Sequence, residues 1–337
     1  MGTNTANEDL AQDPTTLRFL NAVILGTSQP DIVNEDMGTE GSMSMIYSMS
    51  FKATSFYNMA IQVSPDSSLE NSHGAIHVAI GDPYGHMSQL SHSAFDLIFW
   101  LHHANVDRHF IIWQAIYPNV WMLPESDLIC NFTIAPGGHP GHRMLLATRT
   151  LGYSYASVPD TIITNATELS ANVTANINVL YNPEGVFSSP KRKRDENREW
   201  SVAIQALSKA LGERSTIRLY TEDSTPVVSF MCCHPLVANG GNPPGLTYQN
   251  GFTSVDAVKA VGTSDIDDVG DYLKANLRWT VKKMDGTVLP TEQVSSLLIT
   301  VQDEIVTHPA VETELPVYGT KTLHPEITSG KAGGASS

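Results

Sequence analysis

The sequence is poor in several features that mark particular classes of protein. It has three cysteines, Cys130, Cys232 and Cys233, which cannot build a disulfide framework. Lys and Arg total 20 against 35 Asp and Glu, and the resulting net charge of −15 argues against a nucleic-acid backbone or an anionic membrane as the main partner. No apolar run approaches the ~20 residues that span a bilayer. The N-terminus also lacks a basic region followed by an apolar one, so no signal peptide is predicted and a cytoplasmic location is expected.

What the chain does contain is typical of a globular protein with an unusual distribution of histidine. Apolar residues make up 41% and charged residues 16%, and a length of 337 residues allows two domains. Seven of the twelve histidines lie within residues 73–109. Because imidazole is the commonest metal ligand in proteins, this segment is the first place to look for chemistry.

The histidine-rich segment is predicted to be helical. Residues 67–80 can begin a helix at Ser67 or Ser68 and place Leu69, Ile76 and Ile80 on one side. Residues 92–117 form a second helical region, which Pro118 ends. The first 54 residues are polar and weakly patterned, so irregular structure is expected there, with one short helix near 16–25.

The second half of the chain changes character. Residues 119–190 are rich in Gly, Pro, Asn and Thr, and the basic run 191–194 then marks a domain boundary. Beyond Trp200 the pattern alternates, which predicts strands at 216–220, 277–284 and 296–306. The turn at Asp285-Gly286 predicts a hairpin, and a capping box of Ser264 and Asp267 predicts one helix. A mostly antiparallel β domain is therefore expected.

His73 and His77 are four residues apart, which places both imidazoles on one face of a helix. His102 and His103 follow in the next helical region, and only one of them can point inward with the pair. Asp107, four residues after His103, could orient its imidazole through the second ring nitrogen. An all-imidazole site suits copper, zinc or iron, whereas a bare pair is more often ordinary packing or solvent exposure.

The segment LENSHGAIHVAIGDPYGHMSQLSHSAFDLIFWLHHANVDR resembles the second copper-binding segment, copper B, of the tyrosinase and polyphenol oxidase family of fungi. The resemblance implies that His73, His77 and His103 are copper ligands and that His102 is not. It also implies that Glu70 orients a catalytic water and that Phe99 packs against the imidazoles.

The likeness extends to Tyr153-x-Tyr155 and to REWSVAI, DYLKANLRWTV and the C-terminal PVYG…HPEITSGKAGG, which resemble the C-terminal domain of latent fungal tyrosinases. It implies an α+β multidomain protein: a partial α-helical bundle of the tyrosinase core, followed by a mainly antiparallel β domain. The expected division is an irregular N-terminal segment (1–54), a partial core with copper B (55–156), a linker with the basic run (157–197) and a β-rich shielding domain (198–337).

The family's activity is the oxidation of monophenols and o-diphenols to o-quinones with O2 at two coppers, which leads to melanin. Phenolic small molecules and O2 are therefore the expected partners. Arg192 and Arg194 would provide a site for an activating protease that releases the shielding domain, although a solvated linker is the default interpretation of this run.

The sequence also departs from the family pattern. No histidine precedes His73, so only the copper-B ligands are expected and the copper-A half is absent. Residues 1–50 show no likeness to the family. Leu97 replaces a proline, and Gly74 stands where enzymes that hydroxylate monophenols well often have asparagine.

Three alternatives follow from these departures. The chain could be an inactive paralogue that binds one copper or none, or an oxygen carrier like haemocyanin, although the fungal type of C-terminal domain disfavours a carrier. A mononuclear zinc hydrolase would need an HExxH motif, which the sequence lacks.

Overall fold

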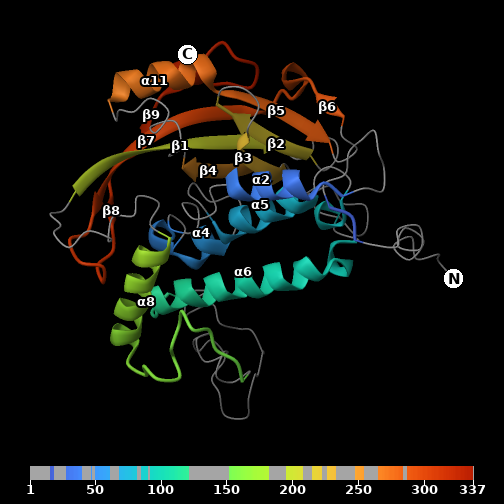
Figure 1. Cartoon of the computed structure of the whole chain (residues 1–337). Helices are drawn as coiled ribbons and strands as arrows, with labels where there is room; N and C mark the ends of the chain where they lie inside the picture. The colour runs from blue at the N-terminus through green and yellow to red at the C-terminus, as the bar shows by residue number, and fades with distance from the viewer. Residues whose placement is uncertain are drawn as a thin grey trace, which may run out of the picture.

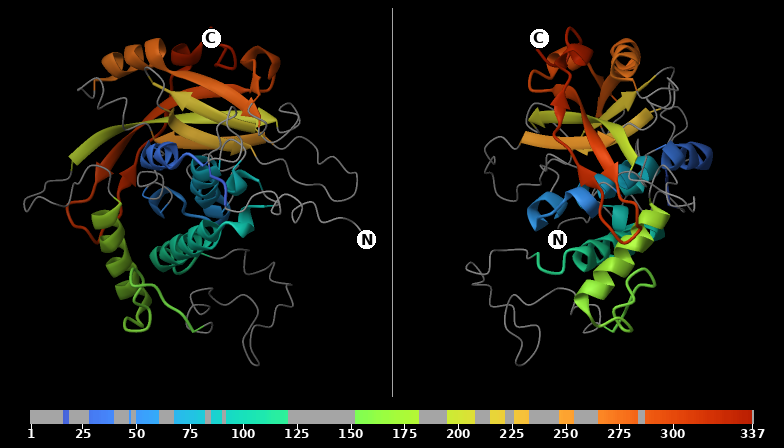
Figure 2. Two further views of the ribbon diagram at one scale, coloured as in Figure 1. Left: turned by 45° about the vertical axis from the view of Figure 1, so that its right-hand side comes forward. Right: turned by 90° about the vertical axis from the view of Figure 1, so that its left-hand side faces the viewer.

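The structure is a computed structural model of the 337-residue chain. It describes residues 16–18, 28–39, 47, 50–60, 68–81, 85–89, 92–120, 152–181, 195–207, 215–221, 226–232, 247–253, 265–283 and 287–336. Figures 1 and 2 show two sheets on one side of the molecule and the helices α6 and α8 on the other, with α2, α4 and α5 between them. The expected combination of a helical core with a C-terminal sheet domain is confirmed.

Among the described residues, the helical part contains α2 (Pro30–Thr39), α4 (Phe56–Ala60), α5 (Leu69–Gly81), α6 (Leu97–Ile116) and α8 (Ala166–Leu180). Short 3-10 turns at His86–Ser88 and Ser93–Phe95 connect α5 to α6. α5 begins after Ser68, whose hydroxyl accepts a hydrogen bond from the backbone N–H of Asn71, as predicted. α6 begins after Asp96, whose carboxylate accepts from the N–H of Ile98, and it ends before Pro118.

The sheet part consists of β1 (Asp195–Leu207), β2 (Ser215–Tyr220), β3 (Pro226–Cys232), β4 (Thr247–Thr253), β5 (Arg278–Lys283), β6 (Val288–Leu289), β7 (Leu298–His308), β8 (Val317–Tyr318) and β9 (Thr322–Leu323). The strand pairs are antiparallel and form two sheets, ordered β4-β1-β7-β8, with β9 also on β7, and β3-β2-β5-β6. The described residues of this part also include the helices α11 (Ile266–Asn276) and α12 (Pro325–Thr328).

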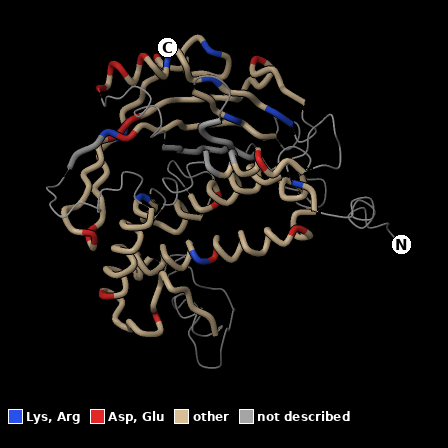
Figure 3. Tube along the Cα trace, viewed as in Figure 1, with Lys and Arg blue, Asp and Glu red and all other residues tan. Residues whose placement is uncertain are grey.

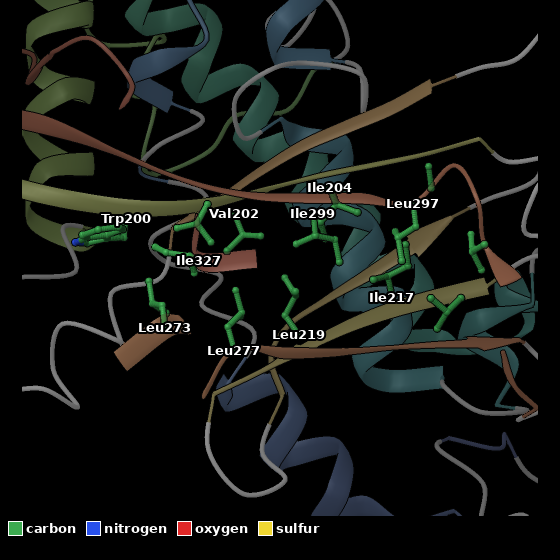
Figure 4. Packing of buried hydrophobic residues seen from close by; sticks show 14 of the residues in the cluster. Trp200, Val202, Ile204, Ile217, Leu219, Leu273, Leu277, Leu297, Ile299 and Ile327 are labelled. Carbon is green, nitrogen blue, oxygen red and sulfur yellow. The ribbon is translucent and has the colours of Figure 1, made fainter. Parts of the chain in front are cut away.

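Alternate residues of the strands fill the space between the two sheets. On β1, Trp200, Val202 and Ile204 point inward, as the period of two requires. They meet Leu219 of β2 and Ile299 of β7 (Figure 4). The predicted strands at 216–220, 277–284 and 296–306 are therefore confirmed to within two residues.

Two expectations about the elements were wrong, and a third, the short helix near 16–25, is tested only over its first three residues. α2 lies in the segment expected to be irregular, where Pro30 at the first helical position and Asp31 in the first turn favour a helix start. Residues 16–18 are not helical, and 19–25 fall outside the described residues. The cap of α11 is Asp265, whose carboxylate accepts from the N–H of Asp267, rather than Ser264.

The linker predicted over 157–197 contains α8, which packs against α6 and belongs to the helical part. Its N-cap is Asn165, whose side-chain oxygen accepts hydrogen bonds from the N–H groups of Thr167 and Glu168. β1 begins at Asp195, three residues before the predicted start of the sheet domain. The basic run, with Arg192 and Arg194, lies outside the described residues, as do Asp285 and Gly286.

The charge distribution agrees with the acidic composition. Acidic positions gather on α11, where Asp267, Asp268 and Asp271 are exposed (Figure 3). Among the described residues, no helix has both the length and the apolar character needed to cross a bilayer.

Candidate metal centre

Three imidazoles converge between α5 and α6. The Nε2 atom of His73 lies 3.0 Å from Nε2 of His103 and 3.1 Å from Nε2 of His77. One ligand atom of each residue lies within 4.8 Å of those of the other two. The structure therefore brings together the three residues that the sequence pattern selected, two from one helix and the third from its neighbour.

Backbone carbonyls fix the orientation of two of these rings. The Nδ1–H of His77 donates to the carbonyl oxygen of Met87 at 2.6 Å, and the Nδ1–H of His103 donates to that of Phe99 at 2.7 Å. A ring that donates from Nδ1 keeps the lone pair of Nε2 available for a metal. The turn His86–Ser88, which follows α5, is thus what holds His77 in place.

Burial keeps His77 in the neutral form that a metal requires. Its side chain is only 2% exposed, and burial lowers the pKa of His77 to about 4, although the hydrogen bond to Met87 opposes the shift. Protons therefore compete with a metal for His77 only in strongly acidic solution.

Glu70 lies beside the first histidine of the group. Its Oε2 is 3.2 Å from Nδ1 of His73, one turn along α5, although the contact does not have the geometry of a hydrogen bond. The Glu70 side chain is half exposed, so it can reach both the imidazole and solvent. The role of orienting a water stays a prediction.

Two further rings enclose the imidazoles. Phe99 lies against His103, with ring centroids 3.9 Å apart, and edge-on to His77 at 6.0 Å. His102 stacks on His73 at 5.3 Å, and its Nε2–H donates to the carbonyl oxygen of His73 at 3.2 Å. The Nε2 atom of His102 is thus occupied by a carbonyl, and His102 is not one of the three converging ligands. Burial, with the neighbouring imidazoles, lowers the pKa of His102 to about 3.

The expectation for Asp107 was wrong. Its Oδ2 accepts hydrogen bonds from the hydroxyls of Tyr153 and Tyr155 at 2.8 and 2.7 Å, while the Nδ1 of His103 is taken by the carbonyl of Phe99. Because that carbonyl is four residues back in the same helix, it reaches the ring without help from a distant side chain. Asp107 instead ties the segment after residue 152 to α6.

Gly74 lies on α5, directly after His73. A Cβ placed at Gly74 would meet no atom within 4 Å, so the backbone at this position can carry a Cβ without a clash. Arg192 and Arg194 fall outside the described residues.

Sequence reasoning missed two contributors to the site. The carbonyl of Met87 orients His77, and its only signal was the Gly-His-Met-Ser loop. Arg18 holds Asp96, the cap of the helix that carries His103, through contacts at 2.8 Å from Nε and from Nη2. No pattern in the sequence connects positions 78 residues apart.

The donor set fits copper. Three imidazoles, without thiolate or carboxylate at the convergence point, are ligands that copper, zinc and iron accept. Within the described part of the chain, this is the one group of three such ligands.

Comparison with known proteins agrees with this geometry. The family model described as the common central domain of tyrosinase matches residues 4–116, including the N-terminal segment in which the sequence alone showed no likeness. The model of the tyrosinase C-terminal domain matches residues 252–301, within the sheet part.

Individual relatives match parts of the chain. The chain is 37% identical to a tyrosinase of Neurospora crassa over 134 residues, which are 37% of this chain and 19% of the relative. It is 57% identical to the haemocyanin βC chain unit G of Helix pomatia over 49 residues, 14% of this chain and 12% of the relative. A solved structure of recombinant mushroom tyrosinase superimposes with a TM-score of 0.71 at 21% identity, covering 93% of this chain and 65% of that one. The chain therefore spans less than two thirds of the length of these proteins, and the superposition shows a shared fold.

Proposed function

Because the chain belongs to the tyrosinase family of copper proteins, we propose that it takes part in the oxidation of phenols to quinones by O2. The observation that carries this proposal is the convergence of the Nε2 atoms of His73, His77 and His103. These three residues would hold one copper ion, which would supply the exchange of electrons between the phenol and O2.

The residues around the imidazoles have separable roles. In His77 and His103 the hydrogen bond from Nδ1–H to a carbonyl sets the ring orientation and the tautomer, which directs the lone pair of Nε2 toward the metal. Phe99 shields the ring of His103 from water and gives a phenol an aromatic edge to pack against. Glu70, half exposed beside His73, is a carboxylate placed to accept the proton that a phenol or a water releases.

The balance between the two phenol substrates is proposed to depend on Gly74. With glycine there, position 74 offers Glu70 no side-chain amide, so diphenol oxidation should exceed monophenol hydroxylation. The Gly74→Asn variant tests this, since a Cβ fits without contact. Its rate on tyrosine relative to a catechol should rise. A preference for tyrosine in the unchanged protein would contradict the proposal.

The direct test of the oxidase proposal is oxygen consumption by the copper-loaded protein with a catechol. The proposal expects consumption that the His103→Ala variant abolishes, while a His139→Ala variant, outside the ligand pattern, retains it. Absence of consumption by copper-loaded protein would contradict it.

A second candidate is a copper protein without oxidase activity. It is favoured by the single group of three imidazoles among the described residues and by the similarity to a haemocyanin unit. Stoichiometry separates the two. About two coppers per chain or per assembly with turnover support the oxidase, whereas one copper without turnover supports the second candidate.

A further inference from the structure

The helix that carries two of the imidazoles is shared by both halves of the molecule. One face of α5 presents His73 and His77 to α6. Ala75, between them in sequence and on the opposite face, belongs to the same buried cluster as Ile204, Ile217 and Ile299 of the sheets. α5 also packs beside β3 (Figure 1). The side of α5 that faces away from α6 therefore packs against the sheet part.

A buried lysine of the helical part forms an ion pair with the sheet part. Glu199 of β1 and Glu304 of β7 lie directly opposite each other in the sheet, an arrangement that destabilises a strand pair unless a cation neutralises it. The cation comes from the helical half. Nζ of Lys52 contacts the carboxylate of Glu304 and lies 3.6 Å from that of Glu199. The Lys52 side chain is 8% exposed and that of Glu304 is 4% exposed, so the charges are largely removed from water.

The same lysine contacts the hairpin formed by β7, the loop 309–316 and β8, which reaches from the sheet to the helices. Nζ of Lys52 lies 4.4 Å from the ring centroid of Tyr318 on β8, within the range of a cation–π contact. The Tyr318 ring packs against the helical cluster that contains Tyr47 and Phe51. In the loop of this hairpin, the carbonyl of Glu314 accepts a hydrogen bond from Nδ2 of Asn178 on α8 at 3.1 Å. Figures 1 and 2 show β8 descending beside α8.

From these contacts we propose that the sheet part is a structural support of the metal centre, and that Lys52 is the positioning residue that couples the two. This inference rests on the proposed function, because it takes the three imidazoles as the copper ligands. Undocking the sheet exposes Ala75 and the apolar side of α5, so the helix loses the wall that aligns His73 and His77 with His103. Release of the sheet then weakens copper binding instead of uncovering a finished site.

The test compares two lysine variants of the full chain. Lys52→Met removes the buried cation, whereas Lys274→Met removes an exposed lysine of α11 and changes the net charge equally. Hydrogen exchange of the backbone amides of α5 is measured without metal, and the affinity for Cu²⁺ is measured by competition with a chelator. Lys52→Met should speed exchange in α5 and weaken Cu²⁺ binding by about tenfold or more, because a buried carboxylate pair is left without its cation. Lys274→Met should change neither.

A double variant guards against general unfolding. Lys52→Met combined with Glu304→Met replaces the buried ion pair with apolar groups of similar size, which is often neutral for stability. It should restore the exchange protection of α5 and most of the Cu²⁺ affinity. If Lys52→Met leaves both α5 exchange and Cu²⁺ affinity unchanged, or if the double variant stays as weak as the single one, the inference is overturned. If the unchanged protein binds no Cu²⁺, the proposed function fails, while the exchange comparison still decides the coupling.

Discussion

Arg18 forms a two-point ion pair with Asp96, in which Nε and Nη2 each lie 2.8 Å from a different carboxylate oxygen. The Asp96 side chain is fully buried and also caps α6. The Arg18 guanidinium holds the pKa of this carboxyl below its ordinary value against the opposing effect of burial. The N-terminal segment is thereby joined to the helix that carries His103.

Replacing Arg18 with methionine should therefore destabilise the protein. Loss of the partner of a buried charge costs about 3 kcal/mol or more, so urea denaturation should show a lower unfolding free energy of that size. Arg18→Lys keeps the charge but loses the second contact, and its loss should be smaller. Equal stability of Arg18→Met and the unchanged protein would show that the pair contributes nothing.

The tyrosine contacts of Asp107 predict a variant that separates stability from metal binding. Asp107→Asn weakens two hydrogen bonds from Tyr153 and Tyr155 but leaves the carbonyl that orients His103 untouched. Unfolding free energy should fall by about 1–3 kcal/mol. Cu²⁺ affinity should stay within about twofold, whereas loss of an orienting partner costs tenfold or more. A tenfold loss of Cu²⁺ affinity would show that Asp107 does orient His103, as the sequence spacing predicted.

His109 predicts a pH dependence of stability. Burial, followed by the charge of Arg108, lowers the pKa of His109 from its ordinary 6.5 to about 3. Below pH 6.5 the unfolded chain binds a proton that the folded chain refuses until about pH 3, so this residue lowers stability progressively as the pH falls through that window. Its share is about 1.4 kcal/mol per pH unit. Above pH 6.5 it has no effect.

The His109→Phe variant isolates this share. It also loses the hydrogen bond from Asn105 Nδ2 to His109 Nε2, which shifts stability by a constant amount at every pH. What should change is the slope of unfolding free energy between pH 6 and pH 4, measured by urea denaturation. Identical slopes for the two proteins would mean that His109 binds its proton at the same pH in the folded and the unfolded chain.

Cleavage in the basic run 191–194 should nick the chain without separating its halves. The contacts of Lys52 with Glu199 and Glu304 and of Asn178 with the hairpin do not depend on the covalent link. After limited trypsin digestion, two fragments should appear in denaturing gels but one species in size-exclusion chromatography. Separate elution of the fragments in native buffer would show that the interface cannot hold by itself.

The site could be predicted from the sequence to the extent that it depends on local periodicity. The four-residue spacing of His73 and His77 fixes a shared helix face whatever the tertiary structure is. The choice of His103 over His102 came from the family pattern, and the structure places His103 with the pair. Asp107 lies on the predicted face, but spacing could not reveal that tyrosines some 50 residues farther along occupy its carboxylate.

The fold shows the same division between local and long-range information. Alternation predicted β2, β5 and β7 because apolar core residues recur at every second position, as Ile217 and Leu219 do on β2 and Ile299 and Val301 on β7. α8 was missed because Thr and Asn have low helix propensity. Its helix is stabilised by Leu169, Val173 and Ile177, which recur at four-residue intervals and pack on α6. The contact of Lys52 with Glu304 joins residues 252 apart and leaves no local signal.

The central claim is that His73, His77 and His103 together bind one copper ion. Titration of the purified protein with Cu²⁺, followed by electron paramagnetic resonance, tests it most directly. The predicted result is a saturable site whose spectrum shows nitrogen ligands, with affinity lowered by more than about tenfold in His77→Ala and in His103→Ala but unchanged in His139→Ala. Binding that survives both ligand substitutions would contradict the account.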